Sequence, residues 1–160
     1  MLRMNSVRKK RTDKTVVKEH IVLAAAKAFA QKGVKTVRMD DIATGLSISK
    51  RTLYELFHDK EDLLLDVMKL HREEMQEYMT QAENVLEVLL KFFQRSAQDF
   101  QNTNRKFFED IEKYPKVMRY IDESRKENLD SAMEFYRKGV EQGIFRNDVN
   151  YNIVRAMVCE

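Results

Sequence analysis

The chain has 160 residues, of which 29 are Lys or Arg and 26 are Asp or Glu, for a net charge of +3. Four Gly, one Pro and an abundance of helix-forming residues predict an all-α protein, and a single Cys excludes an internal disulfide and suits a reducing compartment. No apolar run of about 18 residues could span a membrane and the N-terminus is charged where a signal peptide is apolar, so we expect a cytoplasmic protein without a membrane partner.

The charge is divided unevenly along the chain. Residues 1–60 hold 14 Lys and Arg against 6 Asp and Glu, whereas residues 61–160 hold 15 against 20. This division indicates a basic module that binds a polyanion, followed by an acidic module with another role. Two solvated faces of one domain are the alternative.

The N-terminal region divides into a charged stretch and a helix. Residues 1–14 have no apolar periodicity and are rich in Lys and Arg, which predicts a mobile basic arm. From Val17 to Phe29 apolar residues recur at helical spacing, and Gly33 can adopt the left-handed conformation that ends a helix. We therefore expect the first helix over residues 15–32.

Two short apolar patches follow the first helix. The first has the helical spacing of Met39, Ile42, Ala43 and Leu46. The second is a helix that Ser49 can cap, with Leu53, Leu56 and Phe57 on its buried face. Helices this short are marginal alone, so both must share a core with the first helix in a three-helix cluster.

Longer helices make up the rest of the chain. Asp59 can cap a helix that runs to about residue 80, and further apolar stripes predict helices over 85–100, 107–111 and from Pro115 to just before Gly143. Another helix begins near Asn150, and the sequence ends within its pattern. The predicted domains are residues 15–64, with a connecting helix over about 60–80, and residues 65–160.

The close spacing of the two short helices has a functional meaning. Helices joined by a turn of three or four residues form a helix-turn-helix, whose second helix can enter the major groove of DNA. Lys50 and Arg51 can reach guanine, Thr52 can touch a thymine methyl, and Tyr54 can donate to phosphate. Each could instead be an ordinary surface or core residue, but their combination with a tight turn and a basic arm favours DNA. His58 either ends this helix or contacts phosphate.

The segment from Ile42 to Leu64, IATGLSISKRTLYELFHDKEDLL, resembles the DNA-binding domain of the tetracycline-repressor (TetR) family of bacterial transcriptional regulators. The resemblance lies in Ile-Ala, the turn, the Ser cap, Thr-Leu-Tyr, a Phe three residues later, and Lys-Glu-x-Leu-Leu. It implies that residues 49–57 form the recognition helix and that Thr52 and Tyr54 contact DNA. It also implies that Lys60, at a helix N-terminus, meets a phosphate.

Two positions depart from the family pattern. Ser47 stands where the family usually has Gly, and we expect it to take a positive φ at some cost. Arg38 stands where a Ser or Thr cap is usual; Thr36 is the alternative cap, which would lengthen the helix by a turn and free Arg38 to bind phosphate. The predicted DNA-binding residues are Thr36, Arg38, Ser49, Lys50, Arg51, Thr52, Tyr54, His58 and Lys60.

The second half resembles the family's ligand-binding and dimerisation domain in outline. The resemblance implies a pocket for a small apolar or amphipathic effector, whose candidate walls are Phe92, Phe107, Met118, Tyr120 and Met133; plain core is the alternative. It also implies a homodimer, and a repressor that an effector releases from a palindromic double-stranded operator. Family members usually close with two long helices that pair across the dimer. This sequence ends within the first, so we expect either a truncated sequence or a different dimer.

Two other classes of function fit the sequence less well. The sequence gives little support for an enzyme, because His20, His58 and His71 lack ligand-like spacing with carboxylates and no Gly-rich phosphate loop occurs. No cofactor or metal is therefore predicted. A helical adaptor that binds protein through the same three helices is the alternative to a DNA-binding regulator, although the basic arm and Lys50 with Arg51 argue against it.

Overall fold

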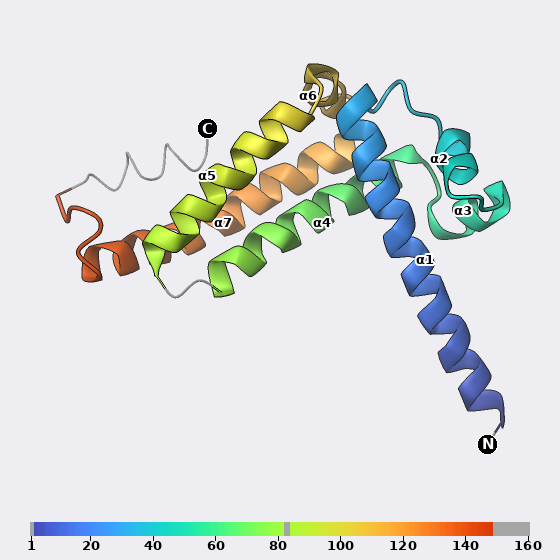
Figure 1. The fold of residues 1–160 in the computed structure, drawn as a ribbon, viewed down its shortest axis with the longest axis horizontal. Coiled ribbons are helices and arrows are strands. Elements are labelled where there is room, and N and C mark those ends of the chain that lie inside the picture. Colours follow the sequence, from blue (N-terminus) through green and yellow to red (C-terminus); the bar gives the residue numbers. More distant parts are fainter. Residues whose placement is uncertain (1, 82–83, 149–160) are drawn as a thin grey trace. The chain divides into compact units, whose positions relative to one another are not determined.

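A computed structural model of the protein describes residues 2–81 and 84–148. These residues form helices and no strand, which confirms the all-α prediction. The helices are α1 (Leu2–Lys32), α2 (Met39–Gly45), α3 (Lys50–Leu56), α4 (Lys60–Gln81), α5 (Val85–Asn102), α6 (Arg105–Ile111) and α7 (Pro115–Glu141) (Figure 1). None of the described helices is long and apolar enough to cross a membrane. The helix expected near Asn150 lies outside the described residues.

The chain divides into two compact units. The first comprises residues up to Leu70 together with Asn102–Tyr114, and the second comprises His71–Gln101 and the chain from Pro115 onward. Helix α6 therefore belongs with the helix-turn-helix, whereas the sequence placed residues 65–160 in one domain. Contacts between α6 and the end of α1 account for this difference.

Helix α1 is longer than its periodicity predicted. It begins at Leu2 instead of near residue 15, so the backbone of the expected arm is helical. No Gly or Pro occurs before Gly33, and Lys, Arg, Leu and Met are all good helix formers. An absent apolar stripe indicates that a segment has no packing face, which does not exclude a helix.

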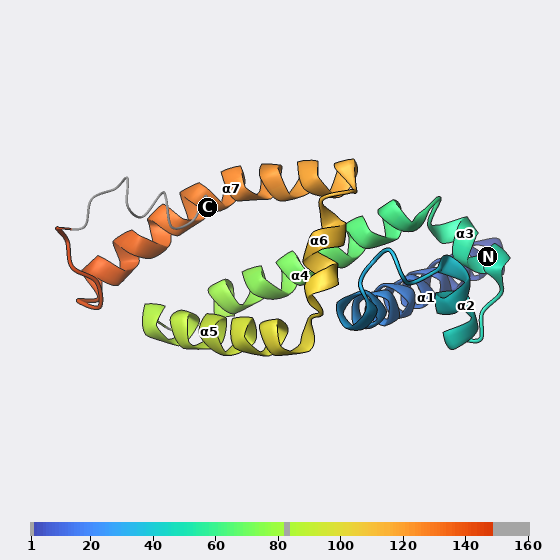
Figure 2. The same ribbon diagram turned by 90° about the horizontal axis from the view of Figure 1, so that it is seen from above.

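The first unit has the shared core that the sequence predicted. Helix α2 lies beside α3 and packs against α1 (Figure 2). The buried apolar residues come from α1, the α1–α2 loop, α2, α3 and its C-cap, the first part of α4, and α6: Ile21, Val22, Ala25, Phe29, Val34, Val37, Met39, Ile42, Ala43, Leu53, Phe57, Leu63, Leu64, Val67 and Ile111. Two-turn helices are stabilised by such burial, since they have little stability of their own.

Helix α6 packs on the C-terminal end of α1. Gly33 has a φ of 81°, and a Cβ on it would lie only 2.9 Å from the Cβ of Lys106. The backbone N–H of Asn104 donates to the carbonyl of Ala30 at 2.6 Å, and its side-chain amide donates to the carbonyl of Gln31 at 3.3 Å. These bonds satisfy carbonyls that the end of a helix leaves without intrahelical partners.

In the second unit, polar contacts join the helices. Arg72 on α4 donates to Ser124 at 3.1 Å and to Glu127 at 2.6 Å, both on α7. Arg95 on α5 donates to Glu74 on α4 at 2.7 Å. Helix α4 is thus hydrogen-bonded to both α5 and α7.

Helix α5 pairs its charged side with α4 and leaves much of its apolar side exposed. Its charged side includes Arg95, which is paired with α4. Four large apolar side chains on its other side are more than half exposed: Leu86, Leu90, Phe93 and Phe100. The described part of the second unit therefore buries little of the apolar face of α5.

Candidate DNA-binding interface

The turn between α2 and α3 contains the predicted strained residue. Ser47 has a φ of 54° and is the one non-glycine residue with positive φ among those described. Its N–H donates to the carbonyl of Thr44 at 3.1 Å, and the N–H of Ile48 donates to that of Ala43 at 3.0 Å. The left-handed residue lets these amides fold back onto α2 and start α3 within four residues. The expectation for Ser47 is confirmed.

The start of α2 corrects one prediction. Arg38 is the N-cap, and its N–H donates to the Asp41 carboxylate at 2.9 Å. This is one half of a capping box, so α2 begins at Met39 without a Ser or Thr cap. The alternative in which Thr36 caps a longer helix is wrong. Thr36 and Arg38 are both exposed, and their contact with DNA stays a prediction.

The start of α3 agrees with the sequence. Ser49 is the N-cap and its hydroxyl accepts the N–H of Thr52 at 3.0 Å, which confirms the predicted cap. The two side-chain hydroxyls lie 2.9 Å apart, within hydrogen-bonding distance. Both side chains are thereby oriented at the beginning of the helix.

The outward face of α3 carries a cation and an anion together. At 100° per residue, Arg51 and Glu55 point away from the fully buried Leu53. Arg51 Nε lies 2.9 Å from Glu55 Oε1, and the guanidinium holds the pKa of that carboxyl below its usual value. Tyr54, half exposed, lies beside them as expected. Sequence reasoning missed Glu55, although its spacing of four from Arg51 was visible.

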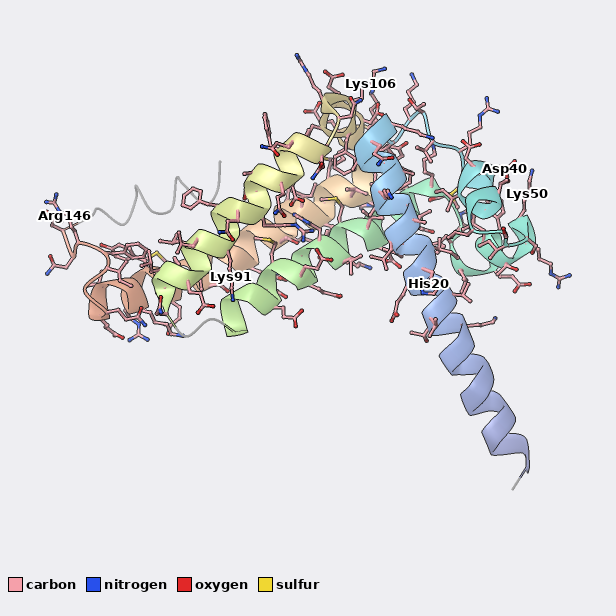
Figure 3. All side chains as sticks on the ribbon, viewed as in Figure 1. His20, Asp40, Lys50, Lys91, Lys106 and Arg146 are labelled. Atoms are coloured by element: carbon pink, nitrogen blue, oxygen red, sulfur yellow. The ribbon has the colours of Figure 1, made fainter. Side chains whose placement is uncertain are left out.

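A second ion pair links α2 to α3. The ammonium of Lys50 bonds to the carboxylate of Asp40 (Figure 3), and this hydrogen bond raises the pKa of Lys50. The sequence explained Asp40 only as a favourable charge at a helix start. Both cations predicted to read bases, Lys50 and Arg51, are therefore paired with carboxylates in the absence of DNA.

The start of α4 is capped as predicted. The Asp59 carboxylate accepts the N–H of Asp62 at 2.9 Å. His58 is exposed, with Nδ1 at 3.4 Å from Asp59. Ligand atoms of these three residues lie within 4.8 Å of one another. Because Asp59 serves as a helix cap, the cluster needs no metal to explain it.

The ammonium of Lys60 forms its hydrogen bonds within the protein. Its ammonium donates to the carbonyls of Val34 at 3.0 Å and Lys35 at 3.3 Å. Partial burial lowers its pKa. Lys60 thus ties the start of α4 to the α1–α2 loop, and its predicted phosphate contact is untested.

Asp110 on α6 holds the same loop from the other side. It is buried, and it accepts the N–H of Lys35 at 2.8 Å and the ammonium of Lys113 at 3.1 Å. The bond from Lys35 is the main reason that the pKa of Asp110 lies below its usual value. Sequence reasoning missed this residue because 75 positions separate it from Lys35.

The predicted effector pocket is dispersed between units. Phe107 lies on α6 in the first unit, whereas Phe92, Met118, Tyr120 and Met133 lie in the second. Phe92 is 48% exposed. The pocket with these walls stays a prediction.

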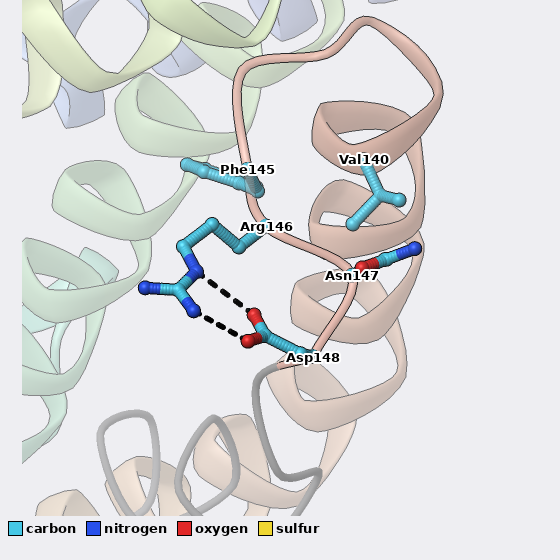
Figure 4. Close-up of a pocket in the computed structure, with 5 residues that line it drawn as sticks. All are labelled: Val140, Phe145, Arg146, Asn147 and Asp148. Carbon is cyan, nitrogen blue, oxygen red and sulfur yellow. Dashed lines mark hydrogen bonds and ion pairs between the residues drawn. The ribbon is translucent and has the colours of Figure 1, made fainter.

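An open pocket of about 350 Å³ lies at the end of α7 (Figure 4). It is lined by Val140, Phe145, Arg146, Asn147 and Asp148, and includes none of the predicted walls. Arg146 and Asp148 pair with each other across it, with Nε to Oδ1 at 2.9 Å. The pair leaves the pocket without a charged group that lacks a partner.

Comparison with known proteins agrees with this geometry. Residues 21–67, which run from the C-terminal part of α1 to the start of α4, match the family described as bacterial regulatory proteins, tetR family. The HTH-type transcriptional repressor KstR2 of Mycobacterium tuberculosis is 25% identical over 146 residues, covering 85% of this chain and 72% of that protein.

Solved structures share the fold. A TetR-family transcriptional regulator from Marinobacter aquaeolei superposes with a TM-score of 0.68 at 20% identity, over 88% of this chain and 72% of its own. A transcriptional regulator from Saccharomonospora viridis in complex with choline gives 0.66 at 20% identity, over 91% and 82%. The match over residues 21–67 thus makes the helix-turn-helix similar to that of the tetR family of bacterial regulatory proteins, and the solved structures show that the chain shares their fold.

Proposed function

We propose that the chain is a non-catalytic repressor that acts in the cytoplasm as a homodimer on a palindromic operator. The observation that carries the proposal is the outward face of α3, which presents Lys50, Arg51, Thr52 and Tyr54 beyond a tight turn. The name of KstR2, a transcriptional repressor, supports repression as the sign of regulation.

We propose two kinds of DNA contact. Lys50 and Arg51 donate to guanine, and Thr52 contacts a neighbouring base. Phosphates are bound by the hydroxyl of Tyr54, by Arg38 and Thr36 before α2, and by His58 and Lys60 near the start of α4. The Ser49 cap sets the start of α3 within this surface.

We further propose that a small apolar or amphipathic effector releases the operator. The choline bound to the Saccharomonospora viridis regulator supports a small-molecule site in a protein of this fold. An effector shifts such an equilibrium only by its differential affinity for the two states. Residues 65–160 are the proposed effector and dimerisation domain, with α4 as the element shared by both units.

Titration of DNA from the protein's own promoter region across a range of salt tests the proposal. For each phosphate contacted, log K should fall against log salt with a slope of about 0.9. A palindrome should bind far more tightly than one half-site, because two recognition helices about 34 Å apart, or a small multiple, act together. No measurable affinity at low salt would favour the helical adaptor instead.

Arg51→Ala separates base reading from phosphate binding. The variant should lose about 1 to 3 kcal/mol of discrimination between operator and random DNA. The matched control is Arg105→Ala, because Arg105 forms an equally exposed pair with Glu109 four residues on, in α6. Equal losses on operator and random DNA would make Arg51 a phosphate contact.

A further inference from the structure

The middle of the outward face of α3 is an ion pair, although a DNA-binding surface gains most from cations alone. Glu55 is 47% exposed and its carboxylate bonds Arg51, whose side chain is 88% exposed. A carboxylate held toward a polyanion costs affinity. Glu55 therefore needs an explanation beyond general attraction to DNA.

The stability of α3 does not explain the presence of Glu55. An exposed pair four residues apart contributes little to helix stability, and α3 is stabilised by its cap and by the burial of Leu53. When Arg51 turns to a base, Glu55 loses its partner. It then needs a hydrogen-bond donor from the DNA, or it faces acceptors that repel it.

Base edges differ in what they offer a carboxylate. In the major groove cytosine presents an amino donor, adenine presents an amino donor beside the acceptor N7, which repels a carboxylate, and guanine presents only acceptors. The acceptors O6 and N7 of guanine suit Arg. Residues four apart on a helix are separated by about 6 Å along its axis, and base pairs by about 3.4 Å. This separation is less than two base-pair steps, so the flexible side chains of Arg51 and Glu55 can converge on neighbouring base pairs.

We propose that Glu55 is a specificity-determining residue that selects cytosine in each half-site, next to a guanine bound by Arg51. In this arrangement the cytosine amino group replaces the guanidinium as the donor to Glu55. A base without a donor at that position leaves the carboxylate unpaired, so the wrong site is penalised. The inference rests on the proposed function, in which α3 reads the major groove.

Selection from a randomised double-stranded DNA pool tests this with the full chain and two variants. The wild type should enrich sites with one strongly preferred cytosine per half-site. Glu55→Gln should shift the preference at that position to adenine, because Gln bonds adenine N6 and N7. Glu109→Gln, which breaks the matching pair with Arg105 on α6, should enrich the same sites as the wild type.

Affinity for random DNA provides a second readout. Glu55→Gln frees Arg51 and removes a negative charge, so binding to random DNA at low salt should tighten by about two- to fivefold, because exposed ion pairs are weak. Glu55→Ala should lose the cytosine preference without gaining adenine. It is the second test should the Gln variant fold poorly.

The outcomes distinguish failure of the proposed function from failure of the inference about Glu55. If the wild type enriches no sequence, the proposed function fails. If the wild type enriches a site and Glu55→Gln enriches it with unchanged base preferences, the inference is overturned while the proposed function stands. A uniform gain in affinity for all sequences would also overturn it, since Glu55 would then act only as a negative charge.

Discussion

At Ser47 the chain accepts a left-handed backbone that glycine adopts without steric cost. A non-glycine residue there costs about 1 to 2 kcal/mol, part of which glycine loses again in the entropy of the unfolded chain. Ser47→Gly should therefore stabilise the protein by about 0.5 to 1 kcal/mol in urea unfolding. Ser47→Ala is the control and should give no gain in stability, because alanine meets the same steric cost as serine. If both variants gained equally, the positive φ of 54° at this position would not be the cause.

Asp110 should make stability depend on pH. Its folded pKa lies below the ordinary 3.8, so its charge stabilises the fold above that value, and the effect is lost as pH falls through the folded pKa. Asp110→Asn keeps an acceptor for the Lys35 N–H but loses the charge, which should cost roughly 1 to 2 kcal/mol at pH 7.

Urea unfolding of both proteins at pH 7 and pH 3 measures this effect. The difference in unfolding free energy between wild type and Asp110→Asn should shrink at pH 3, because this pH lies below the ordinary pKa of 3.8 and the carboxyl is protonated in the unfolded chain. A difference that stays constant between the two pH values would show that the charge of Asp110 has no part in holding the α1–α2 loop.

Residues whose role depends on near neighbours could be predicted from sequence. Ser49 and Asp59 cap helices through amides three positions on, and such local hydrogen bonds follow from residue type and position. Asp110 could not be predicted, because its partner is brought to it only by the packing of α6 on α1. The pairing of Lys50 with Asp40 likewise depends on how α2 and α3 cross.

At the scale of elements, the packing of α6 on α1 makes Gly33 far more sensitive to substitution than Gly45. Gly33 has a φ of 81° and lies where a Cβ would meet Lys106 at 2.9 Å, whereas a Cβ on Gly45 would meet nothing within 4 Å. Gly33→Ala should destabilise the protein by more than about 1 kcal/mol. Gly45→Ala, at the end of α2, should instead stabilise it by up to about 1 kcal/mol.

Thermal and urea unfolding of the two glycine variants measure these opposite effects. The same sign for both would contradict the structure at the junction of α1 and α6. A loss at Gly33 that is equally large in a Lys106→Gly background, where the clashing Cβ is absent, would assign the cost to backbone conformation alone.

Helix bounds were predictable where apolar residues recur, and less so elsewhere. The stripes of α2, α3 and α4 placed those helices within a few residues. The first turns of α1 have no stripe, so their helix was missed. The membership of α6 in the first unit was also missed, because periodicity shows that a helix has a buried face without showing what covers it.

At the scale of the whole molecule, release by an effector has a consequence that does not depend on its identity. If an effector weakens operator binding by some factor, operator DNA must weaken effector binding by the same factor, because the two equilibria share one coupling free energy. A typical coupling of 1 to 3 kcal/mol corresponds to about 5- to 150-fold.

Thermal-shift screening of apolar and cationic compounds, beginning with choline because of its complex with the Saccharomonospora viridis regulator, would supply a ligand. Calorimetric titration of that ligand should then give a lower affinity with saturating operator than with protein alone, by the factor seen in DNA binding. An Arg51→Ala variant that no longer distinguishes operator from random DNA is the control, and adding operator DNA to it at the same concentration should change ligand affinity much less. Equal ligand affinity with and without operator would mean that the compound binds without regulating. A ligand with the same affinity for two states does not shift the equilibrium between them.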